Sequence, residues 1–67
     1  MRIELNGEPV ELAEDASVAA AVDVLRADSA RGVAVAVDGE VVPRSEWGAT
    51  ALREGQQVEV LHAVQGG

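Results

Sequence analysis

The side chains of this 67-residue chain offer little catalytic chemistry. The sequence contains no Cys, so it forms no disulfide and supplies no thiolate as a nucleophile or metal ligand. His62 is the single His, which excludes a site built from several His ligands. Because the sequence offers His62 no evident acid or nucleophile partner, we assign it a structural role. We therefore expect no metal site and no bound cofactor on the chain itself.

The residues best suited to chemistry are the last two, Gly66 and Gly67. Glycine loses the most backbone entropy on ordering, so two glycines at a chain end predict a flexible, narrow tail without Cβ atoms. Such a tail can enter a tight channel of a partner protein and present its carboxylate there. At roughly 3.3 Å per residue, the segment 64–67 reaches about 13 Å. Glycine-rich chain ends are also often frayed without any function, so this pair alone does not establish a reaction.

Size and charge limit the class of protein. A chain of this length makes one domain with a modest core and has no room for a deep cleft. That favours a carrier, a binding module or a subunit. Twelve acidic residues face five Arg and no Lys, and the net charge of −7 disfavours nucleic acid as a partner. The charge suits solubility or steering toward a basic partner. With no signal-peptide pattern and no long apolar run, we expect a cytoplasmic protein without membrane contact.

Two short alternating segments open the chain and must form part of any scaffold for the tail. Residues 2–6 and 9–13 alternate polar and apolar side chains with a period of two, which predicts two strands with one buried face each. Asn6-Gly7 between them is a hairpin signal, because both residues tolerate positive φ. The inward residues of the two strands are expected to be Ile3, Leu5, Val10 and Leu12.

A helix is expected next. Ser17 is its predicted N-cap, with a hydroxyl that accepts from a free backbone N–H of the first turn. The apolar residues that follow recur at helical spacing and form one face. They are Val18, Ala21, Val22 and Leu25. Gly32 marks the exit from the helical region after the polar stretch 28–31.

The second half of the chain repeats the hairpin pattern. Residues 33–37 are apolar throughout, and Asp38-Gly39 is a second hairpin signal before the return at 40–42. Pro43 ends the pairing. We expect an irregular segment at 44–54 and a last strand at 57–64. The predicted core positions of this half are Val33, Val35 and Val37, with Trp47 and Leu52 as anchors of the irregular segment.

This order of elements predicts an α+β protein with the β-grasp fold. A mixed sheet of four to five strands carries one helix on one face, and the first and last strands pair in parallel at its centre. We place the domain at residues 1–64 and the tail with the reacting carboxylate at 65–67.

The last strand has two distinct faces. Val58 and Val60 share one face, and Glu59, Leu61 and Ala63 share the other. If the valines contact the helix, Leu61 and Ala63 face outward beside the tail. An exposed apolar pair there suits a docking surface, although a single exposed Leu and Ala are also ordinary on a protein surface. A shift of one residue in register would exchange the two faces.

Two segments carry the most distinctive motifs of the chain. The first is Val-Ala-Val-Asp-Gly-Glu-Val-Val-Pro-Arg-Ser-Glu-Trp at residues 35–47. The second is Leu-Arg-Glu-Gly-Gln-Gln-Val-Glu-Val-Leu-His-Ala-Val-Gln-Gly-Gly at residues 52–67. The most specific parts are the Val-Val-Pro-Arg-Ser-x-Trp turn and the terminal Val-Gln-Gly-Gly. These segments resemble the sulfur carriers of thiamine biosynthesis, the ThiS family. Arg44 lies in that turn, where we expect it to stabilise the turn or the surface.

The resemblance implies a protein co-substrate rather than an enzyme. In the family, an E1-like adenylating enzyme uses ATP and Mg²⁺ to form an acyl-adenylate at the terminal carboxyl, here that of Gly67. Sulfur from a persulfide-bearing desulfurase or a rhodanese-type protein then replaces AMP and leaves a thiocarboxylate. A thiazole synthase takes that sulfur to build thiazole phosphate. The free carrier is expected to be a monomer. The residues implied in partner contacts are Gly66, Gln65, Val64, Ala63, Leu61 and Glu59.

Three other functions share these features. One is a sulfur carrier for molybdopterin synthesis, although such chains tend to be longer and to have aromatic residues in the core. Another is a ubiquitin-like modifier whose terminal glycine forms an isopeptide bond with a target Lys. The third is a β-grasp binding module without chemistry at its end. The absence of Lys and Cys fits a carrier, because its activated carboxyl then meets no amine or thiol side chain of its own chain. Genome composition explains the missing Lys equally well.

Overall fold

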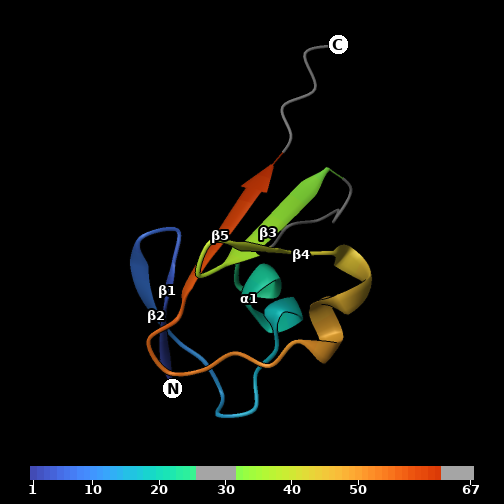
Figure 1. Cartoon of the computed structure of the whole chain (residues 1–67). Helices are drawn as coiled ribbons and strands as arrows, with labels where there is room; N and C mark the ends of the chain where they lie inside the picture. Colours follow the sequence, from blue (N-terminus) through green and yellow to red (C-terminus); the bar gives the residue numbers. More distant parts are fainter. Residues whose placement is uncertain (26–31, 63–67) are drawn as a thin grey trace.

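The computed structural model describes residues 1–25 and 32–62 (Figure 1). Within these residues, five strands form one mixed sheet in the order β2-β1-β5-β3-β4, and a short α-helix covers one face. The elements are β1 (Arg2–Leu5), β2 (Glu8–Glu11), α1 (Val18–Val24), β3 (Val33–Val37), β4 (Glu40–Val42), the 3-10 helix η1 (Arg44–Ala49) and β5 (Gln57–His62). In this part of the chain, no helix has the length and apolar character needed to cross a membrane.

The β5 strand lies at the centre of the sheet, as the sequence predicts for a β-grasp fold. It pairs in parallel with β1, with Glu4 opposite Gln57, and antiparallel with β3, with Val35 opposite Val60. The β1–β2 and β3–β4 hairpins flank it on either side. β5 is therefore held on one side by the hairpin that begins the chain and on the other by the hairpin from its middle.

The core lies between the sheet and α1, and the period-two pattern predicts most of it. Alternate residues of β1, β3 and β5 are buried because they face the helix, and valine packs well on such a pleated surface. The predicted residues that the structure buries are Ile3, Leu5, Val18, Ala21, Val22, Val35, Val37, Trp47, Leu52, Val58 and Val60. Val10, Leu12 and Val33 are half-buried and pack against this cluster.

The start of α1 differs from the prediction. Ser17 is the N-cap residue, but its hydroxyl makes no capping hydrogen bond. The backbone N–H of Val18 instead donates to the carbonyl oxygen of Thr50 at 2.9 Å, and Leu52 N–H donates to Ala16 O at 2.9 Å. The segment after η1 therefore supplies the cap, so a tertiary backbone contact replaces the local side-chain cap.

The end of α1 also differs. Leu25 was expected on the buried face, but the helix ends at Val24 and Leu25 is its C-cap, 38% exposed. The Leu25 N–H donates to Val22 O at 3.1 Å, which tightens the last turn and takes the residue off the face that the 3.6-residue period predicts. The polar stretch 28–31, which was predicted to follow the helix, lies entirely outside the described residues.

The segment 44–54, expected to be irregular, begins with a regular element. Residues Arg44–Ala49 form η1, and Trp47 in its middle is buried in the main core. The Trp47 indole Nε1 donates to Val42 O at 2.9 Å, which satisfies the polar end of the ring and ties η1 to the end of β4. Gly55, in the turn before β5, has a φ of 84°, which glycine adopts readily.

Candidate functional site

The predicted reacting residue, Gly67, lies outside the described residues. So do four of the predicted partner-contact residues, namely Ala63, Val64, Gln65 and Gly66. The structure does describe β5, the strand that precedes this segment, and the sheet surface around its end. Leu61 and Glu59 are the predicted contact residues that it describes.

Leu61 and Glu59 lie on the sheet face opposite α1. Leu61 is 65% exposed and Glu59 is also exposed, whereas Val58 and Val60 between them are buried. A single exposed leucine is ordinary on a protein surface, so Leu61 indicates a contact surface only as part of a larger apolar area. This burial pattern confirms the predicted register of β5 and excludes the register shifted by one residue.

Leu61 belongs to a larger apolar area. Ala34 of β3 lies opposite Leu61, and Ala36 lies opposite both Glu59 and Val41 of β4. Val41 is 75% exposed. We call this area the outer-face patch, which consists of Ala34, Ala36, Val41 and Leu61. The small alanines leave the two larger side chains standing above the sheet.

The sequence analysis missed three of these four residues. Once Val35 is placed inward, the period of two puts Ala34 and Ala36 outward, so the alternation alone contained that signal. Val41 required the register as well, because only its pairing with Ala36 brings it to the same face as Leu61. The patch therefore combines strands that the sequence separates by a turn and by η1.

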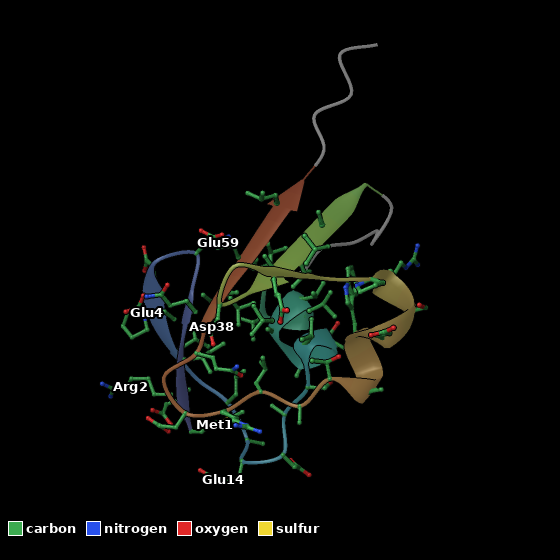
Figure 2. All side chains as sticks on the ribbon, viewed as in Figure 1. Met1, Arg2, Glu4, Glu14, Asp38 and Glu59 are labelled. Carbon is green, nitrogen blue, oxygen red and sulfur yellow. The ribbon has the colours of Figure 1, made fainter. Side chains whose placement is uncertain are left out.

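Two carboxylates lie on the same face of the sheet as the outer-face patch, and Glu59 is paired directly beside Ala36. Glu59 and Glu4 are exposed on the same face, since each alternates with buried neighbours in β5 and β1 (Figure 2). The ion pairs of the described residues involve only the Met1 ammonium and Arg2 with Glu11 and Glu14. Glu59 and Glu4 thus keep their charge available toward solvent. A partner surface with an apolar centre and basic residues around it would match this face.

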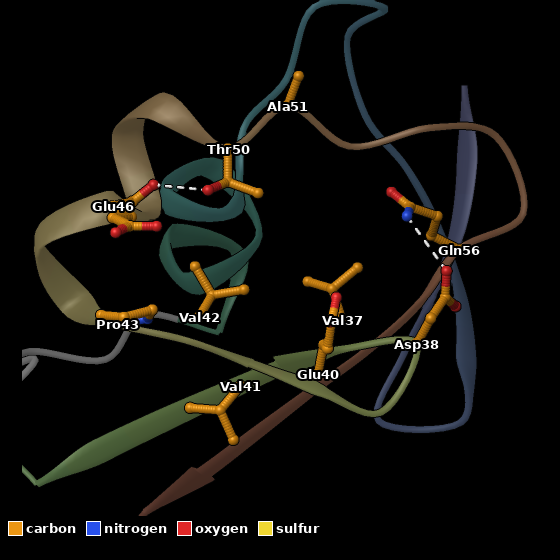
Figure 3. A pocket seen from close by; sticks show the side chains of 10 residues that line it. All are labelled: Val37, Asp38, Glu40, Val41, Val42, Pro43, Glu46, Thr50, Ala51 and Gln56. Carbon is orange, nitrogen blue, oxygen red and sulfur yellow. Dashed lines mark hydrogen bonds between the residues drawn. The ribbon is translucent and has the colours of Figure 1, made fainter.

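A second surface feature lies between β4 and η1. It is an open hollow of about 410 Å³ (Figure 3). Its lining combines apolar, acidic and neutral polar side chains, namely Val37, Asp38, Glu40, Val41, Val42, Pro43, Glu46, Thr50, Ala51 and Gln56. Among the residues that the structure describes, no group of three or more His, Cys, Asp or Glu is placed to hold a metal ion.

Two further residues to which the sequence analysis assigned a role are His62 and Arg44. His62 is the last residue of β5 and pairs through its backbone with Val33. Arg44 is exposed at the first position of η1. The structural roles assigned to them stay predictions.

A mixed sheet with a parallel β1–β5 pair at its centre, one helix on one face and an apolar patch at the tip of the last strand defines a small protein of the ubiquitin-like β-grasp class. Within that class, the family model that matches is the ThiS family, over residues 3–67. The chain belongs to the ThiS family.

Solved structures agree with this family. A crystal structure of the thiamine biosynthesis protein ThiS from Geobacter metallireducens is 33% identical, with a TM-score of 0.82 over 100% of both chains. A solution NMR structure of a thiamine biosynthesis protein from the same species is 35% identical, with a TM-score of 0.80 over 100% of this chain and 88% of that one. SAMP1 from Haloferax volcanii, 22% identical with a TM-score of 0.65 over 98% and 97% of the two chains, shares the fold. No curated protein matches the chain.

Proposed function

We propose that this protein is a sulfur carrier of thiamine biosynthesis, with the Gly67 carboxylate as the group that accepts and delivers sulfur. The observation that carries the proposal is the ThiS family match, which extends to residue 67 and so includes Gly66-Gly67. The two similar structures from Geobacter metallireducens, both of thiamine biosynthesis proteins, support the same pathway.

The chemistry follows from the nature of a carboxylate. An ionised carboxylate is a poor electrophile at neutral pH. An E1-like adenylating enzyme, which holds ATP and Mg²⁺, activates it by forming a mixed anhydride with AMP and releasing pyrophosphate. A persulfide sulfur from a desulfurase or rhodanese-type protein then attacks the carbonyl carbon and AMP leaves. Cleavage of the remaining sulfur–sulfur bond by a thiol leaves the thiocarboxylate, which delivers sulfur to thiazole synthase in the cytoplasm.

The acyl-adenylate meets no side-chain amine or thiol on its own chain, since the sequence has neither Lys nor Cys. The amine of Met1 is occupied: it donates to Leu12 O at 2.7 Å and lies 3.0 Å from a carboxylate oxygen of Glu14. β1 runs parallel to β5, so Met1 lies at the end of the sheet away from the tip of β5 (Figure 1). These features favour a carrier that does not react with itself.

The outer-face patch is the proposed docking surface for the adenylating enzyme and for thiazole synthase. Leu61 lies six residues before Gly67 in sequence, so a partner that binds the patch also has the chain end within reach. Burying the apolar patch supplies affinity, and the carboxylates on the same face, Glu59 and Glu4, favour basic residues on the partner.

Intact-mass analysis tests the reaction. The protein is incubated with ATP, Mg²⁺, an E1-like adenylating enzyme and a persulfide donor, and a variant without Gly67 is the control. The expected product is heavier by the mass difference between sulfur and oxygen, and the variant stays unchanged. A covalent adduct with lysine side chains of other proteins would instead identify a modifier. A chain that stays unmodified would favour a binding module without chemistry at its end.

The acceptor enzyme then separates the two sulfur pathways. Thiocarboxylate carrier is supplied to thiazole synthase and, in parallel, to molybdopterin synthase. We expect the sulfur to be consumed by thiazole synthase. Consumption by molybdopterin synthase alone would assign the chain to the other pathway.

A further inference from the structure

The β1 strand accompanies β5 over only part of its length. The two strands pair at Glu4 with Gln57 and at Leu5 with Val58, and the Asn6 N–H donates to Val58 O at 2.9 Å. The chain then turns away at Asn6-Gly7, with φ of 52° and 85°. Over residues 60–62, the remainder of β5 that the structure describes, no backbone of β1 is left to pair with β5 on that side.

The Asn6 side chain replaces the missing peptide group. Its Oδ1 accepts a hydrogen bond from Val60 N–H at 2.8 Å, and its Nδ2 donates to Val60 O at 3.3 Å. The amide orientation is fixed by chemistry, since Val60 N–H needs an acceptor and Val60 O needs a donor. Asparagine suits this position because it tolerates positive φ and carries both groups at the right reach.

Val60 is the residue directly before Leu61 of the outer-face patch. Beyond Val60, the described part of β5 is paired on the β3 side, where Ala34 and Val33 lie opposite Leu61 and His62. The bonds from Asn6 are thus the last contacts from the β1 side before the strand reaches the patch residue. They extend the contact of β5 with the β1 side past the end of the backbone pairing, as far as Val60.

We propose that Asn6 is a positioning residue for sulfur loading: by fixing the Val60 backbone, it presents Leu61 to the adenylating enzyme in one arrangement. The proposal rests on the proposed carrier function. A strand end paired on one side only samples more conformations, and binding must then restrict them at a cost in affinity. The two bonds restrict them beforehand. Their loss should therefore weaken binding without slowing the chemical step.

The opposite end of β5 supplies a matched control. Asp38, the first turn residue of the β3–β4 hairpin, has a φ of 49° and accepts from Gln57 N–H through Oδ1 at 2.9 Å. Its Oδ2 accepts from Gln56 Nε2 at 3.1 Å. Asn6 and Asp38 are therefore exposed turn residues that hold opposite ends of the same strand. Only Asn6 bonds to Val60, the residue directly before Leu61.

The kinetic test compares Asn6→Gly with Asp38→Gly. Glycine accepts positive φ at both positions, so both turns remain while the side-chain bonds are removed. The KM and kcat of the adenylating enzyme for the carrier are measured by pyrophosphate release, with the melting temperature of each variant. For Asn6→Gly we expect KM to rise about fivefold, which corresponds to about 1 kcal/mol, with kcat unchanged. Asp38→Gly should lower the melting temperature similarly and leave KM unchanged.

Asn6→Asp serves as the conservative variant. It retains an acceptor for Val60 N–H, so its KM should lie close to the wild-type value and well below that of Asn6→Gly. An unchanged KM for Asn6→Gly, or an equal rise for Asp38→Gly, would overturn the proposal, because the effect would then be absent or merely one of stability.

A measurement on the free protein keeps this test independent of the carrier function. Amide hydrogen exchange should accelerate at Val60 and Leu61 in Asn6→Gly, relative to Val35 in the core, and should stay unchanged there in Asp38→Gly. Unchanged exchange at Val60 and Leu61 in Asn6→Gly would overturn the proposal. A wild-type chain that no adenylating enzyme accepts would contradict the carrier function, and the exchange result would still decide the role of Asn6.

Discussion

Leu61 and Val60 are neighbours in β5 with opposite surroundings, since Leu61 is 65% exposed and Val60 is 4% exposed. Leu61→Glu should keep the fold, because a charge added on the outer face stays hydrated in the free protein. In a complex, that charge must lose its water without a partner, and the loss of an interface hot spot costs about 2 kcal/mol, or roughly thirtyfold in affinity. A binding titration against the adenylating enzyme measures this change.

Val60→Glu is the matched variant. It places a carboxylate among Val35 and the other buried residues, so we expect a loss of several kcal/mol in the free energy of unfolding. Thermal melts of the two variants test the docking surface together with the titration. Normal affinity of a folded Leu61→Glu variant would remove Leu61 from the docking surface.

Gly66 is expected to matter for its narrow backbone rather than for any contact within the fold. Gly66→Val introduces a β-branched side chain, which restricts the backbone and widens a segment that has to enter an active site. Adenylation should fall at least tenfold while the melting temperature stays the same. AMP formation and a thermal melt of the same sample check both parts. Wild-type rates for Gly66→Val would show that the site does not require a narrow chain end.

At the scale of the elements, α1 is a short helix held by the rest of the fold. Seven residues are too few for an independently stable helix, and Val18 N–H obtains its acceptor from Thr50. Because the Ser17 hydroxyl makes no capping bond, Ser17→Ala should change the free energy of unfolding by less than about 0.5 kcal/mol, against the ~1 kcal/mol typical of a lost cap. Urea denaturation measures the difference. A decrease of about 1 kcal/mol in the free energy of unfolding would show that the hydroxyl does cap the helix in solution.

The strands and turns could be predicted from the sequence because their signals are local. Alternation in β1 and β5, and a positive-φ turn residue at Asn6 and Asp38, depend only on neighbouring residues. The predictions fail where the local structure depends on residues that are distant in the sequence. The cap of α1 comes from Thr50, and Trp47 joins the main core through η1 and the carbonyl of Val42. No window of sequence around Ser17 contains that information.

The candidate site likewise has features that the local sequence predicts and features that only the tertiary structure reveals. The face of Leu61 was predictable from the period of two, and the structure confirms it. The extension of the patch to Val41 was not, because it depends on β4 pairing with β3 in one register. The bonds from Asn6 to Val60 also join residues 54 positions apart in the chain, so only the parallel β1–β5 pairing reveals them.

At the scale of the whole molecule, the amino terminus closes the end of the sheet away from the outer-face patch. The Met1 ammonium donates to Leu12 O and lies close to the carboxylates of Glu14 and Glu11 (Figure 2). The hydrogen bond with Glu14, with the nearby charges of Glu14, Glu11 and Glu54, raises the pKa of this ammonium above its ordinary value of 8.0. Protonation of the amino terminus therefore favours the folded state.

The sign of the pH effect follows from this raised pKa. The folded state holds the proton more tightly than the unfolded state, so the stabilisation is fully present below pH 8.0 and is lost as the pH rises through the higher pKa of the folded state. The sequence has no Cys, Tyr or Lys, so the amino terminus is the only group that titrates between roughly pH 8 and 11. The melting temperature should therefore fall over that range through this one group.

Glu14→Gln isolates the contribution of the carboxylate. At pH 7 the variant should melt below the wild type, because the ammonium loses the charge on its nearest acidic partner. Above the folded-state pKa the amine is neutral in both proteins, so the difference between their melting temperatures should shrink toward zero. Melts at half-unit steps of pH, in a buffer of constant ionic strength, follow this convergence. A difference that stays constant from pH 7 to 11 would show that Glu14 acts through packing or the local backbone and not through the charge of the amino terminus.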